Sequence, residues 1–264
     1  MKTMSKTLTL SALLLATLVL GCKKEDEDAI SPDKLQQGVM YVTLDDGETI
    51  VGVVDLGLSK SSTRKLWATC NIGSSVPEGL GSTFAWAETT PNKREYDRDS
   101  YQWFYNGENT SISKYCQVAA VAHNGTDTLK ALTPQDDPAS VIYGEKWKTP
   151  SQREFQELLK HCTRTWGTVN GVWGCMLTST ENGNSIFFPL TGVTDTDIRK
   201  NTSVRYTSIG FYWTRDLHTT NPCEAKAVWV KDDGDFSDIG FVDTDRERGL
   251  KVRPIISRAD AGVK

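Results

Sequence analysis

Residues 147–155 read Trp-Lys-Thr-Pro-Ser-Gln-Arg-Glu-Phe, and this stretch is the clearest structural signal in the chain. Within it, Thr149-Pro150-Ser151-Gln152 has the form of a capping box with a proline in the first turn, which predicts the start of a helix. We expect this helix to continue to about Cys162. Its apolar residues fall on one face at helical spacing, namely Phe155, Leu158, Leu159 and Cys162. The sequence therefore predicts a helix that packs one side against the core.

A second, shorter helix is predicted just before this one. Asp137 can accept a hydrogen bond as the N-cap, and Pro138 suits the first helical position. The helix should run to about Tyr143, where Gly144 ends it. The Gln135-Asp136-Asp137-Pro138 segment faintly resembles a lectin carbohydrate motif, but a helix cap explains it better.

Strand signals lie on both sides of the two helices. The Asp45-Asp46-Gly47 turn between apolar runs predicts a hairpin. Further strands are expected over 65–70, 175–180, 185–189, 210–214, 225–231, 236–242 and 250–256. From Gly79 to Thr128 the chain is rich in Gly, Asn, Ser and aromatic residues without clear periodicity, which favours long loops. The predicted fold class is α+β, with two helices, short antiparallel sheets and long loops.

The N-terminus carries an export signal. Lys2 and Lys6 precede an uncharged apolar run that ends in Val19-Leu20-Gly21-Cys22, and this run is too short to span a bilayer. The pattern resembles the lipobox of bacterial lipoproteins. The resemblance implies that residues 1–21 are a signal peptide and that Cys22 carries lipid on its thiol and its new amino group. Residues 22–37 are polar and acidic and are expected to form a flexible tether.

Composition narrows the class of partner. The chain of 264 residues has a formal charge of −4, and loss of Lys2 and Lys6 leaves −6. No basic patch stands out, so nucleic acid is not an expected partner. Five cysteines follow Cys22, an odd count that leaves at least one unpaired.

Several short strings, taken in order, resemble one family. They include Leu66-Trp67-Ala68-Thr69-Cys70-Asn71-Ile72-Gly73, Phe84-Ala85-Trp86-Ala87-Glu88-Thr89, Gly210-Phe211-Tyr212-Trp213-Thr214 and Lys251-Val252-Arg253-Pro254-Ile255. Together with 147–155, they are similar to the Fibrobacter succinogenes major paralogous domain, which is found widely in Bacteroidetes surface lipoproteins. At Thr214-Arg215 the chain differs from the usual sequence of that family, in which small hydroxyl residues are common.

The resemblance implies a C-type-lectin-like fold, similar also to formylglycine-generating enzymes. It implies a single globular domain over residues 38–258, followed by a tail at 259–264. The acidic run after Cys22 resembles the surface-export signal of Bacteroidetes lipoproteins. The implied location is therefore the outer membrane, with the domain at the cell surface.

One acidic turn is the best ligand-binding prediction. Asp232, Asp233 and Asp235 surround Gly234, and Trp229 lies shortly before them. Carboxylates in a loop are typical calcium ligands, and an indole ring can stack on a sugar. A hairpin turn with solvated acids explains the same residues more simply. We therefore expect no catalytic residues, no cofactor and no metal, with calcium at this turn as the open alternative.

The sequence leaves three functional hypotheses. The first is a non-enzymatic surface lipoprotein, attached to the membrane by its lipid, that binds a glycan or a surface protein through lectin-like loops. The second is a structural or assembly component of a surface complex. The third is an enzyme of glycan processing, although no Gly-x-Ser-x-Gly or His-Glu-x-x-His motif is present.

Overall fold

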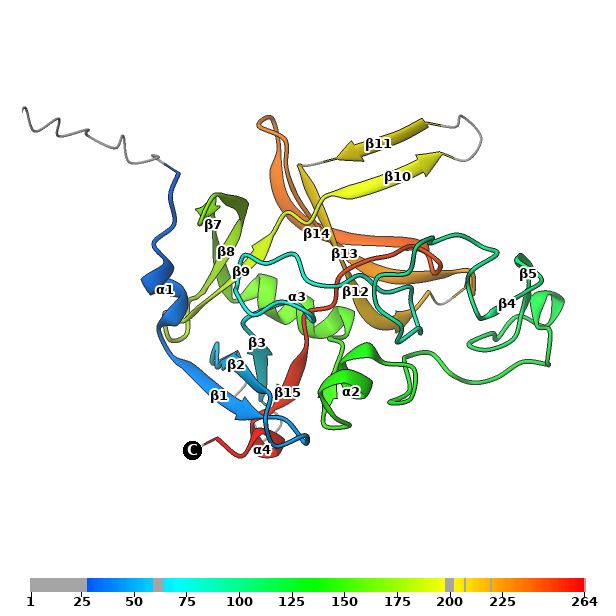
Figure 1. The fold of residues 1–264 in the computed structure, drawn as a ribbon, viewed down its shortest axis with the longest axis horizontal. Coiled ribbons are helices and arrows are strands. Elements are labelled where there is room, and N and C mark those ends of the chain that lie inside the picture. Colours follow the sequence, from blue (N-terminus) through cyan, green and yellow to red (C-terminus); the bar gives the residue numbers. More distant parts are fainter. Residues whose placement is uncertain (1–27, 59–63, 198–201, 207, 219, 264) are drawn as a thin grey trace, which may run out of the picture.

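The computed structural model describes residues 28–58, 64–197, 202–206, 208–218 and 220–263. It is an α+β protein with few helices and several short antiparallel sheets, as the sequence predicts (Figure 1). The largest sheet has the strand order β1-β2-β3-β15-β6. Its strands are β1 (Val39–Thr43), β2 (Ile50–Val54), β3 (Lys65–Ala68), β15 (Ile255–Ser257) and β6 (Trp147–Lys148). The first and last parts of the chain therefore meet in one sheet.

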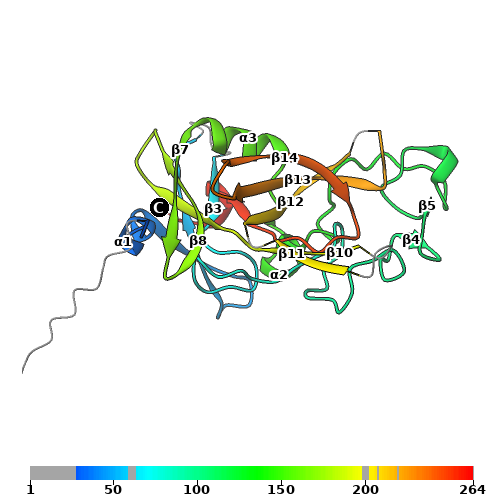
Figure 2. The same cartoon turned by 90° about the horizontal axis from the view of Figure 1, so that it is seen from above.

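Two three-stranded sheets and two ribbons complete the β structure. One sheet contains β7 (Cys162–Val169), β8 (Val172–Ser179) and β9 (Ser185–Pro189), and the other contains β12 (Ile209–Leu217), β13 (Glu224–Asp232) and β14 (Ser237–Asp245). The ribbons are β4 (Phe104–Tyr105) with β5 (Glu108–Ile112), and β10 (Val193–Asp197) with β11 (Thr202–Tyr206). Seen from above, β7–β9 and β4–β5 lie at opposite ends, with β12–β14 between them (Figure 2).

The two predicted helices are present. In α2 (Pro138–Tyr143), Asp137 caps the first turn and Gly144 ends the helix, as expected. In α3 (Gln152–Lys160), the capping box is made by Ser151 and Glu154, two residues later than the expected box that starts at Thr149. Pro150 therefore precedes the helix. In this capping box the Glu154 carboxylate accepts from the Ser151 N–H, and the Ser151 hydroxyl oxygen accepts from the Glu154 N–H.

The core lies on both faces of the β12–β14 sheet. Strand alternation directs Trp213 and Ala227 into one apolar cluster with β1–β3, and Tyr212 and Val228 into another with α3, β8 and β9. Phe155 and Leu158 of α3 are buried in the second cluster, which confirms the predicted apolar face. Burial of such side chains contributes about 1.5–3 kcal/mol each.

A buried arginine, Arg253, connects segments that are far apart in the chain. Arg253 is fully buried, and its guanidinium donates to Asn71 Oδ1 (2.8 Å), to the Thr69 carbonyl (2.7 Å) and to the Phe187 carbonyl (3.0 Å). Its charge also lies 4.8 Å from the Phe188 ring centroid. Because these partners come from two separate segments, residues 69–71 and β9, Arg253 fixes the chain just before β15 against β9 and the residues that follow β3.

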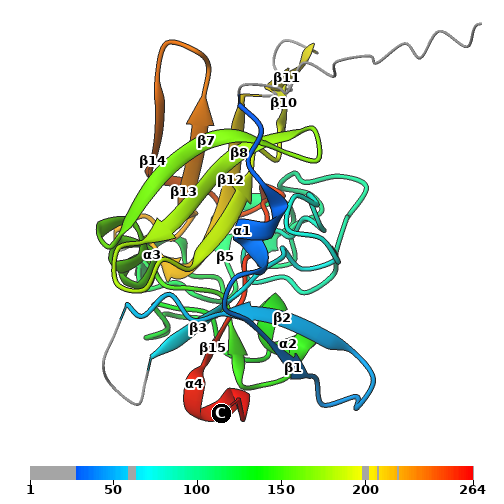
Figure 3. The ribbon, with the colours of Figure 1, turned by 90° about the vertical axis from the view of Figure 1, so that its left-hand side faces the viewer.

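The predicted tether is the main structural correction. Residues from Asp28 to Gln37 are packed on the domain, with α1 at Pro32–Gln36. Ile30 and Leu35 are buried together with Met176 and Phe187. The Ile30 N–H donates to Thr168 O, and Thr168 N–H donates to Asp28 O, both at 2.9 Å, so the segment runs beside β7 (Figure 3). The predicted start of the domain at residue 38 is therefore wrong. Burial of Ile30 and Leu35 packs this acidic segment against the domain.

The C-terminal boundary also differs from the expectation. The segment assigned to a tail starts within the helix α4 (Arg258–Ala261), whose first residue pairs with the Asp55 carboxylate. The remaining strand predictions hold, except that only residues 255 and 256 of the expected strand 250–256 belong to a strand, β15. Strands β6, β7, β10 and β11 were not predicted. The stretch from Gly79 to Thr128 is loop-rich as expected, with only β4, β5 and a short 3₁₀ turn, Ala119–Val121.

Candidate functional site

The predicted ligand-binding residues lie together at one end of the β13–β14 hairpin. Trp229 and Asp232 belong to β13, while Asp233 and Asp235 form the turn that leads to β14. The two strands pair in unbroken register, with Trp229 opposite Gly240 and Asp232 opposite Ser237. The hairpin reading of this acidic turn is therefore confirmed.

Trp229 lies flat on the sheet because its neighbour is a glycine. A Cβ atom at Gly240 would lie 2.4 Å from Trp229 Cζ2 and 2.6 Å from Cε2, so only glycine leaves room for the indole. On the other side Trp229 pairs with Phe211 of β12. Both rings are half-buried, whereas the adjacent Val228 and Val230 point into the core.

Phe236 extends this surface at the turn. Its side chain is 51% exposed, and its ring centroid lies 6.1 Å from that of Trp229. Lys231 places its ammonium 5.7 Å from the Phe236 ring. We call Phe211, Trp229 and Phe236, gathered around Gly240, the aromatic platform. An exposed large apolar side chain beside a half-open indole is a feature of binding surfaces.

Two of the three predicted acids already accept hydrogen bonds from other residues of the protein. Asp232 Oδ2 accepts from Trp173 Nε1 (2.8 Å), and Asp232 Oδ1 accepts from Ser237 Oγ (2.6 Å). Burial raises the pKa of Asp232, but the hydrogen bonds from Ser237 and Trp173 outweigh it and keep the pKa below its ordinary value. The sequence could not predict this use of Asp232, because Trp173 belongs to a different sheet.

Asp233 is likewise engaged by its own turn. Its carboxylate lies 2.6 Å from the Lys231 ammonium and accepts from the Phe236 N–H at 3.0 Å. The hydrogen bonds from Lys231 and Phe236 lower the pKa of Asp233. Only the exposed Asp235 carboxylate accepts no hydrogen bond from the described part of the chain. Asp235 is therefore the one predicted acid that is open to a ligand.

Metal binding at this turn stays a prediction. Among the residues that the structure describes, no group of three or more His, Cys, Asp or Glu side chains is arranged to hold a metal ion. Calcium requires six to eight oxygen ligands, and the internal hydrogen bonds of Asp232 and Asp233 would compete with it.

The three described histidines lie in separate places. His123 stacks on Tyr105 with ring centroids 3.8 Å apart, His161 contacts Glu181 at 3.1 Å, and His218 contacts Asp243 at 3.4 Å. Two cysteines in the core are also inert, because burial raises the pKa of Cys162 and of Cys175 to about 12. A thiol is nucleophilic only when deprotonated, so neither is suited to attack a substrate.

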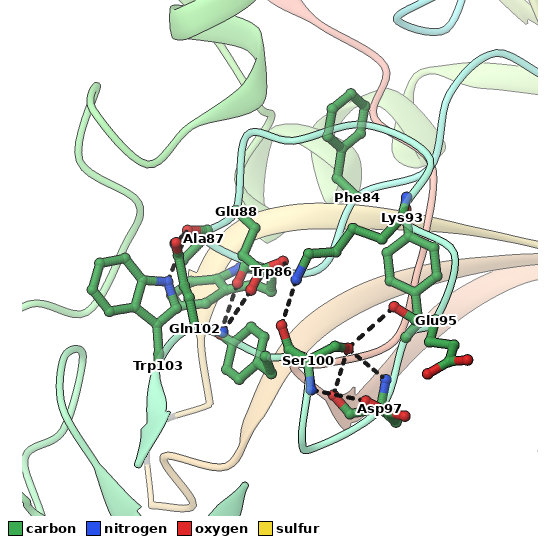
Figure 4. A network of polar contacts seen from close by, with 12 residues as sticks. Phe84, Trp86, Ala87, Glu88, Lys93, Glu95, Asp97, Ser100, Gln102 and Trp103 are labelled. Carbon is green, nitrogen blue, oxygen red and sulfur yellow. Dashed lines mark hydrogen bonds and ion pairs between the residues drawn. The ribbon is translucent and has the colours of Figure 1, made fainter. Parts of the chain in front are cut away.

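A polar network holds the loops between Phe84 and Trp103 together (Figure 4). The buried Glu88 carboxylate accepts from the Gln102 N–H (2.8 Å) and pairs with the Lys93 ammonium (2.6 Å), which also donates to the Ser100 carbonyl. Ala87 adopts a φ of 63°, a strained conformation for a residue with a Cβ. Ala87 also accepts hydrogen bonds at its carbonyl from Gln102 and Trp103, so the network joins residues 87–88 to residues 93–103.

Beneath these loops lies a buried arginine without a counter-ion. Arg246 is fully buried, and its guanidinium carbon lies 4.9 Å from the ring of Trp86 and 5.4 Å from that of Tyr101. It donates to Tyr101 Oη (2.8 Å) and to the Pro222 carbonyl (2.9 Å). No carboxylate in the described ranges lies within ion-pair distance of it. Arg246 therefore joins loops and C-terminal strands by hydrogen bonds and cation–π contacts.

Phe211, Phe236 and Gly240 were not selected from the sequence. The available signals were a phenylalanine inside an acidic turn and a glycine inside a strand, which often marks a close approach. These signals could not be connected without the strand register, because only the register places Gly240 beside Trp229.

No protein-family model matches the chain, and neither curated proteins nor solved structures give a match. The resemblance to the Fibrobacter succinogenes major paralogous domain and to C-type lectins thus stays a prediction from short sequence strings. No helix within the described ranges has the length and apolar content that crossing a membrane requires.

Proposed function

We propose that this protein is a non-enzymatic lipoprotein of the outer membrane, exposed at the cell surface, that binds a glycan through the aromatic platform. The observation that carries the proposal is the indole of Trp229, which lies flat over Gly240 beside the exposed Phe236 ring. A sugar ring has an apolar face that packs on aromatic rings, while its hydroxyl groups hydrogen-bond to neighbouring polar groups. Asp235 and Lys231 supply such groups at the platform edge.

The anchor and the lectin-like assignment support this proposal from the sequence side. Cys22 lies outside the described residues, so its lipidation rests on the Val19-Leu20-Gly21-Cys22 pattern. Lipoprotein anchors carry more than one chain, and each buried methylene contributes about 0.8 kcal/mol to membrane binding. The α+β architecture with a loop-rich middle is compatible with a C-type-lectin-like domain.

A thermal-shift titration of the full-length lipoprotein in detergent tests the proposal. Plant, mucin and microbial glycans would be added with calcium and with chelator. A ligand that binds only the folded state raises the Tm by mass action. We expect one glycan class to do so, and we expect Trp229→Ala and Phe236→Ala to abolish the shift.

Tyr41→Ala is the matched control, since Tyr41 is 64% exposed on a different sheet. An equal loss in this control would mean that the effect does not arise at the platform. A shift that disappears in chelator would place calcium at the acidic turn. Absence of any shift, together with a partner protein that co-purifies, would favour the assembly role instead.

A further inference from the structure

A second surface feature lies between α2, β6 and the end of β12. It is a hollow of about 160 Å³, lined by Leu132, Pro134, Asp137, Ser140, Lys148 and Arg215 among others. Its lining combines the apolar Leu132 and Pro134 with polar and charged side chains, a mixture that is usual in small-ligand pockets. A volume of this size corresponds to about five water molecules at roughly 30 Å³ each, so it can admit a single small ring.

Two backbone hydrogen bonds hold Arg215 next to the hollow. Its N–H donates to the Pro150 carbonyl, and its carbonyl accepts from the Leu132 N–H, both at 2.9 Å. Ala131 and Asp216 form an antiparallel bridge next to these bonds.

The hydrogen-bonding groups that remain unused in the hollow are donors. Asp137 already accepts from the Ala139 N–H, the Thr149 N–H and Thr149 Oγ1 at 2.6–2.9 Å. Ser140 donates its hydroxyl proton to the Trp147 carbonyl. Lys148 is exposed, and its ammonium makes no hydrogen bond or ion pair with the described residues. The hollow therefore suits a ligand group that only accepts hydrogen bonds.

Arg215 keeps most of its donors free as well. Its nearest carboxylate is Glu154, with Nη2 and Oε2 3.5 Å apart, and that oxygen already accepts from Ser151 N and Oγ. Asp216 faces the same region and accepts from the Gln152 N–H at 2.6 Å. Among the described residues, the contact with Glu154 is the one ion pair of the Arg215 guanidinium, which also lines the hollow, so most of its donors are unused.

We propose that the hollow is a second binding site, which takes the carboxylate of a small acidic sugar ring. Arg215 and Lys148 would bind the carboxylate oxygens, because guanidinium and ammonium groups make charge-assisted hydrogen bonds to carboxylates. Leu132 and Pro134 would pack against the apolar face of the ring. This site is separate from the aromatic platform and does not depend on the function proposed there.

Isothermal titration of the full-length lipoprotein in detergent tests this site with three probes. They are galacturonate, galactose, which has a similar ring without the carboxylate, and inorganic phosphate. The titrations use Trp229→Ala, which removes binding at the platform. In this variant we expect galacturonate to bind and its affinity to fall at high salt, whereas galactose should not bind. Lys148→Ala and Arg215→Gln should each reduce galacturonate affinity by at least about tenfold.

Lys146→Ala is the matched control, because Lys146 is exposed two residues away and does not line the hollow. It should leave galacturonate affinity unchanged, as should Phe236→Ala at the platform. Equal binding of galactose, or phosphate binding as tight as that of galacturonate, would overturn the proposal. Unchanged affinity in Lys148→Ala would also overturn it, and this exposed substitution avoids the effect on folding that Arg215→Gln carries.

Discussion

The environment of Arg246 and the tip of the β13–β14 hairpin both combine charged and aromatic side chains, but they differ in burial. Arg246 is sealed among Trp86 and Tyr101 with no access to water. At the tip, Asp233 and Phe236 are exposed. An unpaired polar group inside a protein loses its hydrogen bonds to water, whereas one at the surface regains them.

The comparison shows which polar groups define the fold and which are available for binding. The Arg246 cluster joins segments more than a hundred residues apart, as its bonds to Tyr101 and Lys114 show. The tip bonds, apart from the one to Trp173, connect residues within a few positions of one another. Substitutions should therefore be costly in the first region and tolerated in the second.

The largest effect is expected for Arg246→Ala. It would leave the Pro222 and Lys114 carbonyls unpaired and would open a cavity among three rings, so the free energy of unfolding should fall by about 3–5 kcal/mol. Urea denaturation measures this loss. Arg248→Ala is the control, because Arg248 is exposed and should change stability by about 0.5 kcal/mol or less. A similar loss of stability for both arginines would contradict the idea that buried polar contacts matter more than exposed ones.

An intermediate effect is expected for Gly240→Ala at the platform. The new Cβ would meet the Trp229 ring, and the resulting overpacking should cost about 1–3 kcal/mol. The double variant with Trp229→Ala should recover most of this loss, since the clash is with the ring alone. Thermal denaturation of all four proteins gives the coupling energy. Additive losses would show that the indole does not lie on Gly240.

A smaller effect of opposite sign is expected for Glu247→Gln. Glu247 is buried near Arg246, its Oε2 accepts no hydrogen bond from the described residues, and burial raises its pKa. A raised pKa means that the ionised form destabilises the fold above the folded pKa, and that this penalty disappears as pH falls through it. Glu247→Gln should therefore stabilise the protein at pH 7 by about 1 kcal/mol or less.

That gain should disappear near pH 4, where the wild-type carboxyl is itself neutral. Denaturation midpoints at both pH values measure it, and Glu95→Gln, on an exposed loop, should show no such difference. A loss of stability at pH 7 would mean that the Arg98 contact, 3.5 Å long, outweighs the burial of Glu247.

The smallest effect is expected for Asp232→Asn at the tip. Because its hydrogen bonds lower its pKa, Asp232 stabilises the fold above the unfolded value, and this contribution is lost as pH falls through the folded pKa. Since the site is largely solvated, the difference from wild type should be below about 1 kcal/mol at pH 7 and absent near pH 2. Asp235→Asn should be neutral throughout. A larger loss of stability in Asp235→Asn would show that the Asp235 carboxylate makes a stabilising contact despite its exposure.

Local signals in the sequence were sufficient for much of the fold. The caps of α2, the apolar face of α3 and the hairpins around Asp46 and Gly183 all follow from residues close together in the chain. Strand β7 was missed because its exposed face is polar and its pattern is weak. Residues 28–37 were misassigned because their acidic composition hid Ile30 and Leu35, whose burial depends on Met176 and Phe187.

The sequence by itself determined the two central helices, most of the strands and the acidic hairpin turn, because each depends on neighbouring residues. Lipidation at Cys22, which lies outside the described residues, stays a prediction from the sequence. Only the tertiary structure decided which side chains meet. It placed Gly240 under Trp229, bound Asp232 to Trp173, and brought Lys148 and Arg215 to one hollow. Such contacts join residues that are distant in the chain, and their existence depends on strand register and sheet packing, which no local pattern encodes.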